Sequence, residues 1–331
     1  MLIKILSLFS GAGGLDLGFK LAEEGRYKTI WAIDSDKDAT STFELNFGKD
    51  IIKNQDITLV DPFSNIVPDC DLIIGGFPCQ DFSIIGTRHG IDSQRGNLFQ
   101  YFVNFVSAKR PKAFVAENVQ GLVSANHGQA LKNVIESFEN VGYNVSWQIY
   151  NFADYGVPQF RKRVLFVGIR NDIGVIFDHP KPTHGPKEAK RWISAKDALF
   201  GVEFVPYNNE KIACTKKVEE RLNLIPSGAN YSSIAPTHPL YVKGRRSCIY
   251  RRLDPNQPSY TLLANGGGGT WGYHWSEPRA LTNRERARLQ TFPDDFIFIG
   301  SISSVRRQIG NAVPPWGVVP LAKKLLSIFK E

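Results

Sequence analysis

The stretch Leu72–Ser83, LIIGGFPCQDFS, indicates how the rest of the chain is organised. Three apolar residues run into a Gly-Gly pair, which is typical of a buried parallel strand that ends at a turn. In open α/β sheets, ligands bind at the carboxyl ends of such strands. Pro78 fixes its own φ and holds Phe77 extended, so we expect a stiff loop to present the thiol of Cys79.

Cys79 has two interpretations. An isolated cysteine is commonly a small buried hydrophobe. The glycines before Cys79 and the polar Gln80 and Asp81 after it favour a surface loop, and therefore a nucleophile. The chain's four cysteines include no Cys-x-x-Cys pair and no Cys/His cluster at metal spacing, which predicts free thiols, a reducing cytoplasm and no metal site.

A second glycine-rich turn, Ser10–Gly18, follows the first predicted strand, Leu2–Phe9. Its glycines would let the backbone turn tightly and approach a ligand. The next predicted strand, Thr29–Ile33, leads to Asp34, about twenty residues after the glycines, where an acidic side chain meets ribose hydroxyls in nucleoside-binding units. The pattern GxGG lacks the third glycine of a dinucleotide fingerprint. It therefore predicts an adenosine-bearing cofactor, with a turn that binds nothing as the alternative.

Further polar residues follow predicted strands. A third apolar approach ends at Asp56, and the predicted strand Ala113–Ala116 stops at Glu117. Because Glu117 lies on the same sheet edge as Cys79, it is a candidate acid or base, although a solvated loop residue is the alternative.

Two later strands, Asn144–Tyr150 and Val164–Ile169, are predicted to be joined by a loop that contains QFRKR, residues 159–163. Arg161 and Arg163 stand at alternate positions and would point to the same side. They could converge on an anion or a base carbonyl, whereas solvated arginines are the ordinary alternative.

After Asn171, frequent prolines and weak periodicity predict a second, irregular, β-rich domain. Residues 241–290 hold nine Lys/Arg and three acids, so nine minus three, or +6, of the chain's net charge of +8 lies there. These basic residues are mostly arginines interleaved with aromatics, which suits phosphate and base contact better than solubility alone. Asn265–Gly269, NGGGG, would let backbone lie against another molecule, and Thr282–Glu285 is a capping box that opens a short helix.

The predicted fold class is α/β, with a doubly wound, mostly parallel sheet and a smaller irregular domain. The larger domain is predicted to comprise residues 1–190 and 308–331, and the smaller one residues 191–307. The apolar run Leu2–Phe9 is too short for a membrane span and lacks a signal-peptide cleavage site, so no membrane association is expected.

The order of the motifs resembles a known family. SLFSGAGG, GGFPCQDFS, RGNLF, AENV, QFRKR, RALTNRERARLQTFP and QIGNAVPP are together similar to the DNA cytosine C5-methyltransferases of bacterial restriction–modification systems. The resemblance covers nearly the whole chain; only Asp172–Glu277 lacks a strong match, although TLLANGGGG within it is similar too. It implies a Rossmann-like methyltransferase fold with a target-recognition domain, and methylation of carbon 5 of a flipped cytosine in duplex DNA.

The resemblance also implies S-adenosylmethionine as methyl donor and S-adenosylhomocysteine as product. Phe9, Gly11 and Gly13 would cradle the methionine part, Asp34 would hold the ribose and Asp56 the adenine amino group. Asp34, Ser35 and Gln55 depart from the residues common in the family, which bears on adenine stacking and not on the chemistry. The remaining expected cofactor contacts are Gly14, Ser35, Ile57, Pro78, Leu98, Asn311 and Ala312.

By the same resemblance, Cys79 would add to carbon 6 of cytosine, Glu117 would act on the ring nitrogen, and Arg161 and Arg163 would lie near the carbonyl. The cytosine must leave the base stack for these groups to reach it. The expected DNA contacts are Gln80, Ser83, Arg245, Arg246, Arg251, Arg252, Thr261, Gly267 and Trp271.

The expected partner is double-stranded DNA, with a monomeric enzyme in a bacterial cytoplasm and a cognate restriction endonuclease that acts on the same site without a stable complex. Three alternatives stay open. An RNA (tRNA) cytosine-5 methyltransferase is disfavoured by the large basic second domain, and a non-catalytic DNA-binding relative by the intact PCQ and ENV. A nicotinamide-dependent oxidoreductase is disfavoured by the missing third glycine.

Overall fold

The chain forms two compact units. The computed structural model describes residues 2–78, 98–243, 247–264 and 269–329. Unit 1 comprises Met1–Asn151, Lys162–Lys181 and Val318–Glu331, and unit 2 comprises Phe152–Arg161 and Pro182–Gly317. The units differ from the predicted domains because residues 152–161, 182–190 and 308–317 belong to unit 2.

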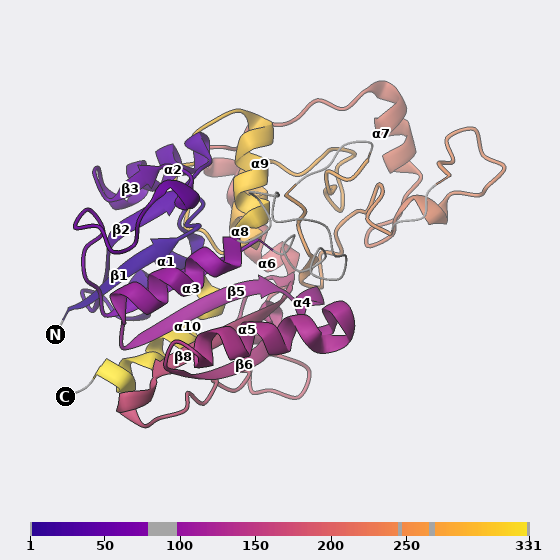
Figure 1. Cartoon of the computed structure of the whole chain (residues 1–331). Coiled ribbons are helices and arrows are strands. Elements are labelled where there is room, and N and C mark those ends of the chain that lie inside the picture. Colours follow the sequence, from indigo (N-terminus) through magenta and orange to yellow (C-terminus); the bar gives the residue numbers. More distant parts are fainter. Residues whose placement is uncertain (1, 79–97, 244–246, 265–268, 330–331) are drawn as a thin grey trace, which may run out of the picture. The chain divides into compact units, whose positions relative to one another are not determined.

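Unit 1 is built on a seven-stranded sheet with the strand order β3-β2-β1-β4-β5-β8-β6 (Figure 1). Strands β1 to β5 pair in parallel, and β8 runs antiparallel to both β5 and β6. The predicted mostly parallel sheet is therefore confirmed. The strands are β1 (Ile3–Leu8), β2 (Tyr27–Asp34), β3 (Ile52–Asn54), β4 (Leu72–Gly76), β5 (Ala113–Val119), β6 (Tyr143–Asn151) and β8 (Lys162–Arg170).

Helices pack on both faces of this sheet. Leu6 and Leu8 of β1 join the core cluster that contains Phe105 of α3 and Phe138 of α5, whereas Ser7, between them, faces α1. This alternation is what a strand covered on both faces requires. The helices are α1 (Gly14–Ala22), α2 (Lys37–Phe47), α3 (Leu98–Lys109), α4 (Gly121–Ser124), α5 (Gln129–Glu139) and α10 (Pro315–Leu325).

An aromatic cluster anchors the chain where β4 ends. The ring of Phe77 packs against Phe99 and Phe102 of α3, with centroid separations of 5.0 and 6.1 Å. Phe114 of β5 and Phe138 of α5 stack at 4.1 Å within the same cluster. Burial of a phenylalanine stabilises a fold by about 1.5–3 kcal/mol, so Phe77 fixes the backbone two residues before Cys79.

A buried carboxylate holds α1 to the sheet. Asp16, in the first turn of α1, accepts hydrogen bonds from Ser7 Oγ of β1 at 2.9 Å and from Thr29 Oγ1 of β2 at 2.8 Å. Burial raises the pKa of Asp16 to about 6, even though both hydroxyl donors oppose the shift. This contact fixes the helix that directly follows the glycine-rich turn.

Unit 2 contains little sheet. In the described part of the chain its strands are β7 (Gln159–Phe160) and β9 (Ser259–Tyr260), which pair in parallel. The prediction of an irregular domain is confirmed, but the prediction that it is β-rich is wrong. Its helices are α6 (Ala195–Leu199), α7 (Lys216–Asn223), α8 (Asn283–Leu289) and α9 (Ile302–Asn311).

The predicted capping box opens α8. Thr282 accepts a hydrogen bond from the backbone of Glu285, and the Glu285 carboxylate accepts one from the backbone of Thr282. No helix in the described ranges is both long enough and apolar enough to cross a bilayer.

The raised pKa of Asp16 predicts a pH-dependent stability. Ionisation of Asp16 costs more in the folded than in the unfolded chain, so the free energy of unfolding should fall as pH rises from about 4 to about 6. The limit for this contribution is about 3 kcal/mol. In Asp16→Asn it is absent, and the stability of the variant relative to wild type should rise across this window in urea titrations.

The exposed Glu24→Gln serves as the control for the loss of one negative charge. Parallel stability curves for wild type and Asp16→Asn between pH 4 and 6 would show that this carboxyl titrates normally.

Candidate active site

A carboxylate and a guanidinium meet at the carboxyl end of β5. Strand β5 continues through Glu117, where the sequence predicted it to stop, because β8 pairs with β5 as far as Val119. Arg163 of β8 places its Nε 2.9 Å from Glu117 Oε1, and both side chains are largely buried. The two residues form an ion pair at the sheet edge where α/β enzymes bind ligands.

The two glycines of β4 have different structural reasons. An ideal Cβ on Gly75 would lie 2.2 Å from the carbonyl oxygen of Leu8 in β1, which is a clash with backbone. Gly76 stands opposite Glu117 in the parallel register, and an ideal Cβ there would lie 3.0 Å from Glu117 Oε2. Gly75 thus permits the sheet, and Gly76 leaves room for the carboxylate.

Asn118 connects this site to the loop that follows β4. Its Nδ2 donates a hydrogen bond to the carbonyl oxygen of Phe77 at 2.9 Å, and its side chain is buried. The bond fixes the backbone next to Pro78, which is half-buried. Sequence analysis did not single out Asn118, although its place after Glu117 was the available signal. Cys79, Gln80 and Ser83 lie outside the described residues.

The glycine-rich turn adopts an unusual backbone. Phe9, Gly11 and Gly13 have φ values of +52°, +53° and +86°. A left-handed phenylalanine costs conformational energy, and such strain is concentrated at functional sites. No described atom lies within 4 Å of an ideal Cβ on Gly11, so this part of the turn faces open space. A Cβ on Gly13 would lie 2.3 Å from the Phe47 ring of α2, so packing requires glycine there.

Asp34 holds the same turn from the end of β2. Its Oδ2 accepts from the backbone N–H of Gly11, and its Oδ1 from that of Asp36, both at 2.8 Å. Burial raises the pKa of Asp34 above its ordinary value, and these backbone donors oppose the shift. A carboxylate has further lone pairs, so Asp34 can also accept from vicinal hydroxyls such as those of a ribose.

The other predicted cofactor residues differ in setting. Asp56 is exposed and caps the turn Ile57–Leu59, because its Oδ1 accepts from Thr58 N at 2.9 Å. Ile57 is buried in the unit 1 core. Gly14 is buried at the start of α1, Leu98 is half-buried at the start of α3, and Ser35 is exposed. Asn311 and Ala312 belong to unit 2, where α9 ends.

Arg161 and Arg163 do not share a target among the described residues. Arg161 is buried in unit 2, and its Nη2 donates to the carbonyl oxygens of Gly310 at 3.0 Å and Asn311 at 3.5 Å. The expectation that both side chains point to the same side fails because β7 ends at Phe160 and β8 begins at Lys162. Side-chain alternation holds only within a continuous strand.

Arg252 is a correction to the predicted DNA interface. It is buried, and its guanidinium donates to the carbonyl oxygens of four residues. Irregular backbone has carbonyl groups that no sheet ladder satisfies, and an arginine offers five donors for them. The prediction of DNA contact at Arg252 is therefore not retained. Its acceptors are Leu222, Ile225, His274 and Trp275, at 2.9, 2.9, 3.0 and 2.6 Å.

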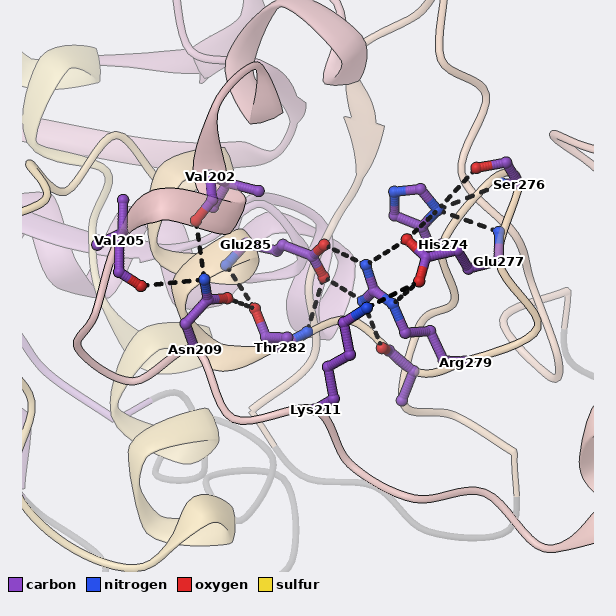
Figure 2. Close-up of polar contacts among 11 residues, drawn as sticks. Val202, Val205, Asn209, Lys211, His274, Ser276, Glu277, Arg279, Thr282 and Glu285 are labelled. Carbon is purple, nitrogen blue, oxygen red and sulfur yellow. Dashed lines mark hydrogen bonds and ion pairs between the residues drawn. The ribbon is translucent and has the colours of Figure 1, made fainter.

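Much of the positive charge of residues 241–290 is used inside unit 2. Figure 2 shows Arg279 between Glu277 and Glu285, with bonds of 2.8–3.0 Å to both carboxylates. The hydrogen bonds from Arg279 lower the pKa of Glu277 to about 2. Arg288 pairs with Asp294 at 2.8 Å. Composition alone therefore overstates the charge that this span can offer to a phosphate.

Other predicted DNA contacts keep a partly exposed side chain. Arg251 is half-buried and lies over the Tyr260 ring, with Cζ 4.5 Å from the centroid. Trp271 is half-buried and carries Arg306 over its ring at 4.0 Å. Thr261 donates from Oγ1 to the carbonyl oxygen of Phe160 at 2.7 Å. Arg245, Arg246 and Gly267 lie outside the described residues.

A parallel sheet with a strained glycine turn, an acid at the end of β2 and an ion pair at the end of β5 defines an α/β enzyme that binds a nucleoside-containing cofactor. A family model for the C-5 cytosine-specific DNA methylase matches residues 3–327. The chain therefore belongs to the C-5 cytosine-specific DNA methylase family, and its activity is that of a DNA (cytosine-5-)-methyltransferase. The oxidoreductase alternative is set aside.

Two relatives support this assignment. The chain is 54% identical to Type II methyltransferase M.NgoFVII of Neisseria gonorrhoeae, over 99% of this chain and 87% of that protein. It is 44% identical to Type II methyltransferase M.BbvI of Brevibacillus brevis, over 97% and 90% of the two chains.

Solved structures agree in fold. A prophage-encoded E. coli protein assigned as a DNA modification methyltransferase superimposes with a TM-score of 0.78 at 25% identity, over 99% of this chain and 100% of that one. The Dnmt2 methyltransferase of S. pombe shares the fold, with a TM-score of 0.70 at 20% identity over the full length of both chains.

The contact between Gly76 and Glu117 predicts a variant that impairs catalysis and spares the fold. Gly76→Ala should displace the Glu117 carboxylate and lower the methylation rate by about tenfold to a hundredfold, with little change in melting temperature. Gly75→Ala should instead lower the melting temperature, because its Cβ meets backbone. Gly121→Ala, where no described atom lies within 4 Å of the added Cβ, is the matched control and should change neither quantity much. A fully active Gly76→Ala enzyme would show that the carboxylate does not depend on this space.

Proposed function

We propose that this enzyme transfers the methyl group of S-adenosylmethionine to carbon 5 of a flipped cytosine in duplex DNA, through a covalent adduct of Cys79 at carbon 6. The observation that carries the proposal is the Glu117–Arg163 pair, which Asn118 links to the backbone two residues before Cys79. Relatives named as Type II methyltransferases support a modification enzyme of a restriction–modification system.

Cys79 makes the cytosine reactive. Carbon 5 is a poor nucleophile, and addition of a thiolate to carbon 6 converts the ring to an enamine whose carbon 5 can attack an electrophile. A few per cent of a cysteine's thiol is ionised near neutrality, which suffices for a nucleophile. After methylation, a base removes the carbon 5 proton and the Cys79 thiolate leaves.

Glu117 and Arg163 stabilise the charge that forms as Cys79 adds. A proton or hydrogen bond from Glu117 to the ring nitrogen takes up that charge. Arg163 Nε lies on Glu117, and its Nη1 donates to the carbonyl oxygen of Lys162 at 2.9 Å. We assign Nη2 as the donor to the cytosine carbonyl oxygen, where negative charge also develops.

Unit 1 offers a binding site that fits the cofactor. When bound, S-adenosylmethionine supplies an electrophilic methyl group on its sulfonium. The turn from Phe9 to Gly13 faces open space at Gly11, which suits the methionine part. Asp34 stands at the end of β2 with lone pairs for the ribose hydroxyls. The other proposed contacts are Gly14, Ser35, Asp56, Ile57, Pro78, Leu98, Asn311 and Ala312.

Duplex DNA is the proposed substrate, and the cytosine must rotate out at a cost of a few kcal/mol. Arg251 and Trp271 are the described side chains that best suit phosphate or base contact, with Thr261 beside them in the proposal. Gln80, Ser83, Arg245, Arg246 and Gly267 complete it. We further propose a monomer in the bacterial cytoplasm, with a cognate endonuclease that cleaves the same site without forming a stable complex.

Loss of the nucleophile tests the mechanism. Cys79→Ser should abolish incorporation of labelled methyl into duplex DNA, while affinity for S-adenosylhomocysteine and DNA stays near the wild-type value. Near-full turnover by Cys79→Ser would end the covalent mechanism. Wild-type product on tRNA and none on duplex DNA would favour the RNA alternative, and no product on either would favour a non-catalytic relative. Duplex with 5-fluorocytosine should trap a covalent complex with wild type and none with Cys79→Ser.

The DNA interface has its own test. Loss of one phosphate contact should make the slope of log affinity against log salt shallower by about 0.9, so Arg251→Gln should flatten it by this amount. Lys132→Gln, an exposed position on α5, is the control for loss of one charge. Arg252→Gln should instead lower the melting temperature, because it leaves buried carbonyl groups without donors. An unchanged slope in Arg251→Gln would remove this residue from the interface.

A further inference from the structure

The motif QFRKR is divided between the two units. Residues 159–161 belong to unit 2, and Lys162 begins the segment that forms β8 of unit 1. Arg163 is the member that pairs with Glu117. Gln159 and Arg161 are buried in unit 2. Their contacts therefore require a different explanation from those of Arg163.

Gln159 anchors the strand from which Arg161 extends. Its Nε2 donates to the carbonyl oxygen of Leu289 at the end of α8, at 3.2 Å. Its Oε1 accepts from the backbone N–H of Leu262 at 3.1 Å, just beyond β9. Both ends of the amide are thus engaged, and the short strand β7 is fixed to two other segments of unit 2.

Arg161 contributes to an unusual end of α9. The last four carbonyl groups of a helix have no partner within it. In α9, the carbonyl oxygen of Gln308 accepts from Ala312 N at 3.1 Å, and that of Ile309 accepts from Gln290 Nε2 at 2.8 Å. Those of Gly310 and Asn311 accept from Arg161 Nη2. The positive charge of Arg161 also suits the negative end of the helix dipole.

Gly310 shows how closely the surrounding backbone packs. An ideal Cβ on Gly310 would lie 2.4 Å from both N and Cα of Ala264. The segment after β9 therefore lies directly on the last turn of α9. Arg161 caps this turn next to that contact, so the positions of Asn311 and Ala312 depend on it.

We propose that Arg161 is a positioning residue that fixes the end of α9, and with it Asn311 and Ala312, for cofactor binding. The assignment rests on the proposed function, in which these two residues contact S-adenosylmethionine. It replaces the sequence-based assignment of Arg161 to the cytosine carbonyl, and leaves that contact to Arg163.

Binding and turnover separate the two assignments. Arg161→Met keeps an apolar stem and leaves two carbonyl groups without their donor. The Kd for S-adenosylhomocysteine, measured by calorimetry, and the KM for S-adenosylmethionine should rise by about tenfold or more, with kcat within about threefold of wild type. Arg161→Lys keeps one charged donor and should give an intermediate Kd.

Arg284→Met is the matched control. Arg284 is also fully buried in unit 2 and donates to the carbonyl oxygens of Tyr207, Pro293 and Phe296 at 2.8–3.0 Å. This variant should lower the melting temperature and leave the Kd for S-adenosylhomocysteine within about twofold of wild type. An equal rise in Kd for both methionine variants would mean a general structural effect and overturn the proposal.

A fall in kcat with unchanged Kd in Arg161→Met would overturn the proposal in favour of a contact with cytosine, and wild-type values for both would overturn it outright. Where Arg161→Met does not fold, Arg161→Lys decides: a Kd raised about threefold or more supports the proposal, and an unchanged Kd refutes it. Wild-type enzyme that neither binds S-adenosylhomocysteine nor methylates DNA would refute the proposed function itself.

Discussion

The parallel pairing of β4 with β5 is the constraint on which the proposed active site depends. Its register places Gly76 opposite Glu117, and the missing Cβ of the glycine leaves space for the carboxylate. Because side chains alternate along a strand, a slip of one residue would turn Glu117 to the opposite face of the sheet. The antiparallel pairing of β8 with β5 then brings Arg163 within 2.9 Å of that carboxylate. The ion pair is thus a consequence of strand order and register.

The cofactor turn depends on carboxylates from the same sheet. Asp34 accepts the Gly11 N–H, and Asp16 connects the following helix to β1 and β2. Burial raises the pKa of both carboxyl groups, so the fold carries an electrostatic cost at neutral pH to keep this turn rigid. A rigid turn limits the entropy lost when a ligand binds, which gives that cost a function.

Arginine has two uses in unit 2. Backbone outside regular sheets and long helices leaves carbonyl groups that need donors, and buried guanidinium groups supply them at Arg161, Arg252 and Arg284. Others form ion pairs within the unit, as Arg279 does with two glutamates (Figure 2). A basic span in an irregular domain therefore measures internal bonding as well as affinity for DNA. Only side chains with some exposure, such as Arg251, remain candidates for the second role.

The sequence by itself determined the strands that end on glycines or acids, the capping box at Thr282 and the family, because each of these rests on local patterns or on short motifs in order. It did not determine which arginine meets Glu117, nor that Arg252 is buried. The bond from Arg161 to Gly310 joins residues 149 positions apart, and such contacts follow from packing that no local pattern encodes. Only the tertiary structure decided them, because a strand's alternation stops where the strand ends, and a side chain beyond that point takes whichever partner the packed backbone offers.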